Sequence, residues 1–240
     1  MATQILVLTE DTGREAVPTF RALLKRLVHF YDDMGQLTVT VRPGQEREYP
    51  RVGSNFWREN GERAANDRRL LCKTIATNLA LGEVVLFHTD ADATWATQHE
   101  RLSQDFDAKI RRPVRQWLND AGARNGRDPA WAQACEKRLI HVVPTWSIEA
   151  WTYQATGKAL ELCGTQYGGR DAAKFRIWEG DRAQLDEVAK PKDHVCLSNK
   201  HNAKLAAAVP VAEVFALGKS FTRFVQTLRE LSEFSDRMHC

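Results

Sequence analysis

Val84-Val85-Leu86-Phe87-His88-Thr89-Asp90-Ala91-Asp92 is an apolar run that ends in two carboxylates separated by one residue. Apolar residues at successive positions are typical of a strand covered on both faces, as in a parallel sheet. Ligands of such sheets bind beyond the carboxyl ends of the strands, where Asp90 and Asp92 lie. Because side chains alternate along an extended chain, both carboxylates can point to one side and bind one divalent cation. The Asp-x-Asp alone is equally typical of a solvated turn.

Apolar runs alternate with helical periodicity along most of the chain. Strands are expected over residues 5–8, 37–41, 84–88 and 139–143. Helices are expected over residues 17–31, over about 59–81 with Gly82 as the C-terminal cap, over about 99–121, and from Ser147 as the N-cap. This alternation predicts an α/β fold with a mostly parallel sheet and helices on both faces.

Residues 1–160 are expected to form the α/β core, and residues 161–240 an insert and a helical C-terminal extension packed on the same domain. The glycine-containing segment 163–192 shows weak periodicity, which favours a mobile or inserted segment. Helical patterns return over residues 202–208, 211–217 and 220–234. Nothing in the sequence indicates a separate second domain.

Composition is that of a globular protein. The chain has 240 residues, 43% hydrophobic and 27% charged, with a formal net charge of +3, which leaves a nucleic-acid partner open. The five cysteines are scattered without a CxxC pair, so neither a zinc site nor a disulfide framework is expected. No segment approaches the roughly 20 apolar residues of a membrane span, and the first residues lack a basic leader. We expect a cytoplasmic protein with reduced thiols and no membrane association.

Further carboxylates follow other predicted strands. Glu10 comes directly after the first strand, and Glu149 opens the helix after the fourth. With Asp90 and Asp92, they would converge on one edge of a parallel sheet, and four buried carboxylates repel one another unless a cation offsets their charge. If the four carboxylates converge, we therefore expect the site to hold Mg²⁺ or Mn²⁺. Taken singly, Glu10 is also typical of a turn and Glu149 of a first helical turn.

This order of motifs resembles a known family. A strand then Glu10, a strand then Asp90-Ala91-Asp92, and then Ser147-Ile148-Glu149-Ala150-Trp151 look like the Toprim fold of the overcoming-lysogenization-defect (OLD) nuclease type. The likeness is closest to small stand-alone Toprim-like proteins of prokaryotic defence loci. Lys200, Lys204 and the Ser220-Phe221-xx-Phe224 stretch resemble their C-terminal tail.

The resemblance implies a Rossmann-type Toprim fold and a metal-dependent nuclease, acting on DNA more than on RNA, in anti-phage defence with a separate ATPase. The chain itself contains no GxxxxGK[ST] motif. In the family, the glutamate and the DxD bind the divalent metals. Here Glu10 is followed by Asp11-Thr12-Gly13 rather than directly by glycine, so Asp11 or Glu15 could share its role.

The residue types suit phosphodiester hydrolysis, which needs an activated water and charge stabilisation on phosphate oxygens. Asp90 and Asp92 would be the primary metal ligands, Glu10 a ligand or general base, and Glu149 part of a second metal site. Lys200 would neutralise the phosphate, with Lys204 as the next choice. Either lysine is equally typical of a solvated helix start.

Two helices carry basic residues that would contact phosphates without sequence preference, or simply form solvated faces. These residues are Arg63, Arg68, Arg69, Lys73, Lys109, Arg111, Arg112 and Arg115. Trp57, Trp95, Trp146 and Trp151 could stack on bases, although Trp151 is more typical of the core. His88, His141, Cys72 and Cys135 are expected in the core.

Other functions fit parts of the pattern. A nucleotide-sugar glycosyltransferase also uses a DxD after an apolar strand, but gives Glu10 no metal role. An aspartyl phosphatase would place its DxD after the first strand rather than the third. A Toprim-like scaffold that binds a partner protein would leave the acidic site weak or unused. The sequence leaves open whether the substrate is DNA or RNA and how many metal ions bind. It also leaves open the oligomeric state, and the protein could be a homo-oligomer.

Overall fold

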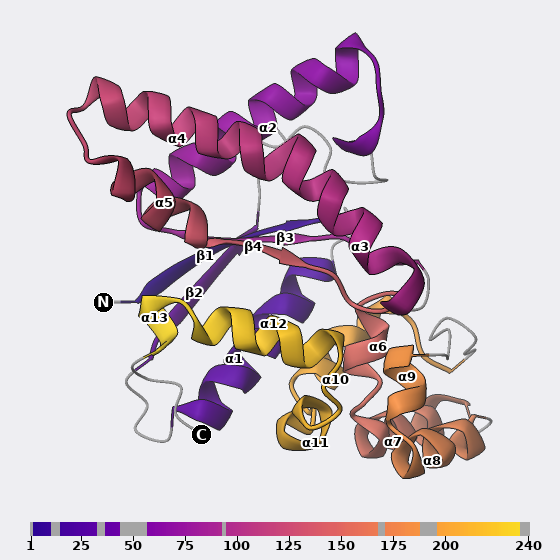
Figure 1. The fold of residues 1–240 in the computed structure, drawn as a ribbon. Coiled ribbons are helices and arrows are strands. Elements are labelled where there is room, and N and C mark those ends of the chain that lie inside the picture. Colours follow the sequence, from indigo (N-terminus) through magenta and orange to yellow (C-terminus); the bar gives the residue numbers. More distant parts are fainter. Residues whose placement is uncertain are drawn as a thin grey trace. The chain divides into compact units, whose positions relative to one another are not determined.

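The computed structural model describes residues 2–10, 15–32, 37–43, 57–92, 95–167, 171–187 and 196–235. Four parallel strands form one sheet in the order β2-β1-β3-β4 (Figure 1). The strands are β1 (Thr3–Thr9), β2 (Val39–Pro43), β3 (Val84–His88) and β4 (Leu139–Val142). The predicted α/β fold with a parallel sheet is confirmed, and the β3 prediction matches to the residue.

The two central strands carry the longest apolar runs. Every residue of β3 is buried, as are Ile5 to Leu8 of β1. β1 and β3 pair from Ile5 with Val84 to Thr9 with His88, so both strands end at the same edge of the sheet. Continuous apolar runs were the reason for expecting strands covered on both faces in a parallel sheet.

The chain divides into two compact units. Unit 1 comprises residues 1–12, 38–89 and 100–142, and unit 2 comprises residues 13–37, 90–99 and 143–240. The sheet lies in unit 1. The sequence-based division at residue 160 stays a prediction.

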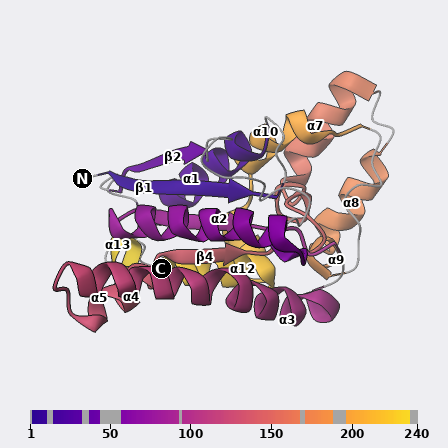
Figure 2. The same ribbon diagram turned by 90° about the horizontal axis from the view of Figure 1, so that it is seen from above.

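Helices of unit 1 cover one face of its sheet. They are α2 (Glu62–Ala80), α4 (Arg112–Arg124) and α5 (Pro129–Lys137), and α2 and α4 run side by side in both views (Figures 1 and 2). The predicted helix over 99–121 is longer and is built from α3 (Trp95–Phe106), the π-helical turn η2 (Asp107–Arg111) and α4. α5 begins at Pro129, with the Asp128 carboxylate accepting the N–H of Ala130 at 2.7 Å.

α2 ends as predicted at Gly82. Gly82 has φ +87°, its N–H donates to Leu79, and the N–H of Glu83 donates to Asn78. This pair of hydrogen bonds satisfies the last helical carbonyls around a left-handed residue, a conformation that glycine adopts without strain.

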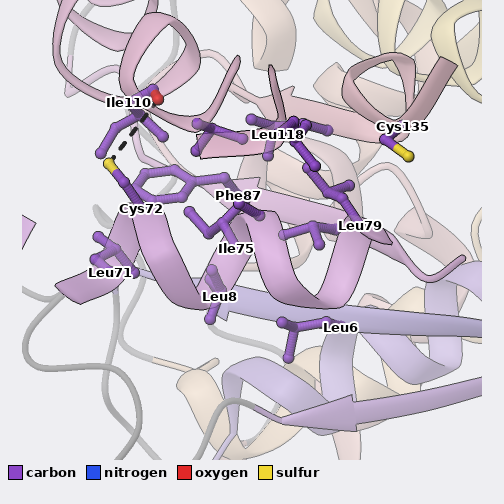
Figure 3. Close-up of a cluster of buried hydrophobic side chains, with 14 of the residues drawn as sticks. Leu6, Leu8, Leu71, Cys72, Ile75, Leu79, Phe87, Ile110, Leu118 and Cys135 are labelled. Atoms are coloured by element: carbon purple, nitrogen blue, oxygen red, sulfur yellow. Dashed lines mark hydrogen bonds between the residues drawn. The ribbon is translucent and has the colours of Figure 1, made fainter. Parts of the chain in front are cut away.

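The core of unit 1 lies between the sheet and α2, η2 and α4. Figure 3 shows Leu6, Leu8 and Phe87 from the sheet facing Ile75 and Leu79 of α2. Trp57 joins this core edge-on to Phe87, with ring centroids 5.5 Å apart. These side chains are 0–2% exposed, as expected of a close-packed protein core.

Unit 2 is helical. Its helices are α1 (Ala16–Tyr31), α6 (Glu149–Thr152), α7 (Thr156–Tyr167), α8 (Ala172–Gly180), α9 (Ala183–Glu187), α10 (Asn202–Ala206), α11 (Val211–Phe215), α12 (Ser220–Arg229) and α13 (Ser232–Ser235), with the 3₁₀ turn η3 (Asn199–His201). In the described part of 163–192, α7, α8 and α9 pack around Phe175, Trp178 and Leu185, so the mobile alternative is wrong there, and the inserted alternative stays a prediction. Residues 168–170 and 188–195 lie outside the described residues.

A disulfide joins Cys163 of α7 to Cys196, with Cα atoms 5.3 Å apart. The expectation of reduced thiols throughout is therefore wrong for this pair. The sequence spacing of 33 residues did not predict this disulfide, because only the packing of α7 against the segment before η3 brings the two cysteines together. Cys72 and Cys135 are free and buried, as expected.

Among the described residues, no helix is both long and apolar enough to cross a membrane.

Candidate functional site

The Asp90–Asp92 turn follows the buried end of β3. Thr89 is fully buried, its N–H donates to Val142, and its hydroxyl lies 2.8 Å from Nε2 of His141. Asp90 is then half-buried and Asp92 exposed. The chain thus passes from core to surface within three residues, which leaves the Asp92 carboxylate open to solvent.

Backbone hydrogen bonds tie this turn to the loop that follows β4. The N–H of Ala91 donates to Pro144 at 3.3 Å, and the N–H of Asp92 donates to Trp146 at 2.9 Å. Asp92 and Trp146 both adopt left-handed backbone conformations, with φ of 52° and 58°. Asp tolerates this region through its short polar side chain, whereas a tryptophan there costs energy that the surrounding structure must supply. Strain of this kind is concentrated at functional sites.

Glu149 follows the same loop and is buried at the start of α6. It is 6% exposed, and its Oε1 accepts the N–H of Asn202 Nδ2 at 2.8 Å. Burial, with Glu149 one helical turn away, raises the pKa of Tyr153 well above its ordinary range. A carboxylate at this depth needs a donor, and Asn202 supplies one. The helix begins at Glu149 with Ile148 as its N-cap, so the expectation that Ser147 caps it is wrong.

Four polar side-chain atoms close to Glu149 are buried and have no hydrogen-bond partner among the described residues. Three belong to residues within four positions of Glu149 in the sequence, and the fourth belongs to Asn202, which contacts Glu149. They are Thr145 Oγ1, Ser147 Oγ, Thr152 Oγ1 and Asn202 Oδ1. Buried polar groups in proteins are almost always satisfied, by water or ligand where not by protein. Hydroxyl, amide and carboxylate oxygens are also the ligand types that Mg²⁺ and Mn²⁺ prefer, so the chemistry of this donor set fits the predicted metals.

Glu10 lies at the end of β1 in unit 1. It is half-buried, and its N–H donates to the carbonyl of His88 at 3.0 Å. The register therefore places Glu10 beside Thr89, the residue bonded to Asp90 in the chain. Asp11 lies outside the described residues. Glu15 is described, and its backbone carbonyl accepts the N–H and hydroxyl of Thr19.

Lys200 is exposed in η3, and Lys204 is exposed in α10. The turn is held by a capping box in which the Ser198 N–H donates to His201 Nδ1 at 3.0 Å. His201 is 3% exposed, and burial lowers its pKa, with Lys200 and Lys204 adding to the shift. Two residues after Lys200, Asn202 reaches Glu149. Asn202 was not predicted, because only the polar Ser-Asn-Lys-His-Asn string marks its position in the sequence.

Asp90, Asp92, Glu149 and Lys200 thus belong to unit 2, and Glu10 to unit 1. Across the described ranges, no group of three or more His, Cys, Asp or Glu side chains is placed to hold a metal ion. The four-carboxylate metal site stays a prediction.

Three of the eight basic residues predicted on these helices form ion pairs with described carboxylates. Arg111 and Arg115 pair with Glu136, and Arg112 pairs with Asp107. Arg68, Arg69 and Lys109 line a cavity instead.

Of the four tryptophans considered for base stacking, Trp57 and Trp151 lie in the core, and Trp151 stacks on Phe224 with ring centroids 5.3 Å apart. Trp146 is half-buried, and the side chain of Trp95 lies outside the described residues.

The core prediction for the two strand histidines is confirmed for His88 and only in part for His141. His88 is 2% exposed, and the half-buried His141 stacks on Phe106, with ring centroids 4.0 Å apart.

The chain matches none of the protein-family models, curated proteins or solved structures with which it was compared. The residues themselves therefore carry the functional argument.

Proposed function

We propose that this protein is a divalent-metal-dependent, Toprim-like nuclease that hydrolyses phosphodiester bonds, with DNA preferred over RNA. The observation that carries the proposal is the pair of backbone hydrogen bonds from Ala91 and Asp92 to Pro144 and Trp146. They join the DxD turn to the loop that leads into Glu149, so three of the four predicted ligands come from neighbouring backbone in one unit.

Bound Mg²⁺ or Mn²⁺ would supply a nucleophilic water at neutral pH and charge stabilisation on the phosphate. Asp90 and Asp92 would hold the ion, and the exposure of Asp92 would leave room for substrate. Asn202 orients the Glu149 carboxylate through its hydrogen bond. Glu10 would be a further ligand or the general base, and Lys200 would offset the phosphate charge from a solvent-accessible turn.

Plasmid cleavage tests the proposal. Supercoiled DNA and an RNA of matched sequence are incubated with the protein in Mg²⁺, Mn²⁺ or EDTA. Loss of a metal ligand removes several kcal/mol of transition-state stabilisation, so we expect Asp90→Asn, Asp92→Asn and Glu10→Gln to slow cleavage about 100-fold or more. Glu213→Gln, an exposed change in α11, is the matched control. Cleavage at the wild-type rate by all three variants would show that the site is assigned wrongly.

A partner-binding scaffold is the second candidate. It is favoured by the absence of a three-residue metal group among the described residues, and by the Glu149 oxygen already bonded to Asn202. Calorimetric titration separates the two candidates. A nuclease binds Mn²⁺ and loses this binding in Asp92→Asn, whereas a scaffold with an idle site takes up no metal.

Cellular context belongs to the proposal as well. An anti-phage role with a separate ATPase would require nucleotide-driven control from another chain, and co-purification with that ATPase tests it. A cytoplasmic location stays a prediction, and the Cys163–Cys196 disulfide bears on it because cytoplasmic thiols are mostly kept reduced. Trapping of thiols in intact cells would give the redox state of this pair.

A further inference from the structure

A cavity of about 370 Å³ opens between α2 and the η2–α4 run, entirely within unit 1. Its lining includes Arg68, Arg69 and Cys72 from α2, and Lys109, Gln116 and Trp117 from η2 and α4. This volume lies at the lower end of the range for small-molecule sites. None of these residues belongs to the acidic turn.

The π-helical turn contributes Lys109 to the lining of this cavity. In η2, the N–H of Arg112 donates to Asp107, five residues back, so this turn is wider than the α-helical turns beside it. The Cys72 thiol reaches the carbonyls of Lys109 and Ile110 at 3.7 and 3.9 Å, the second of which is drawn in Figure 3. Burial raises the pKa of this thiol to about 12, so it keeps its proton and adds no negative charge to the lining. π-helical turns are common at functional sites.

The cavity lining carries three cationic side chains, Arg68, Arg69 and Lys109. Arg68 donates to the carbonyls of Trp57 and Glu59, and Lys109 donates to that of Arg58, while Arg69 is exposed. These contacts hold two of the side chains in place without neutralising their charge. None of the three forms an ion pair with a described carboxylate, unlike Arg111, Arg112 and Arg115 on the facing run.

Asp120 is the one acidic residue of the lining, which therefore holds three cations and one carboxylate. Fixed, unneutralised guanidinium and ammonium groups at a cavity rim are the usual means of binding phosphate. The charge of the site therefore selects an anion.

Trp117 gives the cavity an aromatic wall. The ring is half-buried and packs against the core of unit 1, which fixes its position. Lys73 Nζ lies 5.8 Å from the ring centroid, so a cation already sits over its face. A flat aromatic ligand can replace this exposed lysine at small cost, because one exposed cation–π contact is weak. Base stacking on an anchored tryptophan is favourable for every nucleobase.

We propose that this cavity binds a nucleoside phosphate, with the base against Trp117 and the phosphate against Arg69, Lys109 and Arg68. The ligand is a free nucleotide or one nucleotide of a single strand, since both present the same base and phosphate. The site is independent of metal-dependent cleavage at the acidic turn.

Binding is measured by calorimetry in EDTA, with AMP, adenosine, inorganic phosphate and a short oligodeoxyadenylate as probes. AMP is expected to bind more tightly than adenosine or phosphate, because only AMP engages both the ring and the cations. Trp117→Ala and Arg69→Ala should each weaken AMP binding about ten-fold or more. Ala65→Trp, which fills the cavity from α2 without removing charge, should abolish binding.

Matched controls are Arg112→Ala, whose side chain is exposed and paired with Asp107, and Trp131→Phe, a half-buried core tryptophan outside the lining. Both should bind AMP within two-fold of the wild type, and circular dichroism melting verifies the fold of every variant. Tight oligonucleotide binding with weak AMP binding, lost in the same variants, assigns the site to a single strand.

Absence of binding by every probe would overturn the proposal, as would binding that Trp117→Ala and Ala65→Trp leave unchanged. Either result would leave the plasmid test of Asp90→Asn untouched, since that variant reports on unit 2.

Discussion

At the scale of single residues, Asn202 joins the proposed site to the helical C-terminal part. Its amide is the donor that the structure gives to the buried Glu149 carboxylate. Asn202→Ala leaves that oxygen without its donor, so we expect a loss of about 1–3 kcal/mol in the free energy of unfolding. Cleavage should also fall about 10- to 100-fold, as for other residues that orient metal ligands.

Asn199→Ala is the control for this change, because Asn199 is exposed in the adjoining turn. Denaturant unfolding and plasmid cleavage measure both effects. An Asn202→Ala protein with wild-type stability and activity would mean that Glu149 needs no orienting donor.

His201 should make the free energy of unfolding depend on pH. Burial lowers its pKa, with Lys200 and Lys204 adding to the shift, so the unfolded chain binds this proton more readily than the folded protein. The contribution of His201 to stability is therefore fully present above its ordinary pKa of about 6.5 and is lost as the pH falls below it. The wild type should lose stability relative to His201→Gln below pH 6.5, with a slope of at most about 1.4 kcal/mol per pH unit. Parallel stability curves for the two proteins would contradict this shift.

At the scale of elements, Gly82 and Gly157 form a matched pair. A Cβ at either position meets nothing within 4 Å, but only Gly82 has a positive φ. Gly82→Ala should therefore destabilise the protein by about 1 kcal/mol through backbone strain alone. Gly157→Ala, at the start of α7, should stabilise it by up to about 1 kcal/mol. Thermal unfolding of both variants measures the difference, and equal effects would contradict the αL assignment at Gly82.

The Cys163–Cys196 disulfide restrains the segment that leads from α7 to η3. It closes a loop of 33 residues, and the loss of loop-closure entropy in the unfolded chain predicts about 3–4 kcal/mol of stabilisation. Dithiothreitol should lower the melting temperature of the wild type and leave that of Cys163→Ser/Cys196→Ser unchanged. An equal response of both proteins would place the stabilisation elsewhere.

At the scale of the whole molecule, the two units interleave along the chain. Residues 13–37 belong to unit 2, whose larger part begins at residue 143. A fragment of residues 1–160 keeps every segment of unit 1 but deprives α1 of α10 and α11. In hydrogen exchange, we expect β1 and β3 amides of the fragment to stay protected and α1 amides to lose protection. Protected α1 amides would instead support residues 1–160 as a self-sufficient core.

The sequence by itself determined the parallel α/β sheet, the limits of β3 and the end of α2, because burial on both faces and helix caps are written in adjacent residues. It also marked Asp90, Asp92 and Glu149 as chemically suited to a divalent cation. Only the tertiary structure decided that Asn202 donates a hydrogen bond to Glu149, that Cys163 pairs with Cys196, and that Trp117 lines one cavity with the arginines of α2. Each of these contacts joins segments 33 or more residues apart, and no local pattern encodes which distant residues the packing of helices brings together.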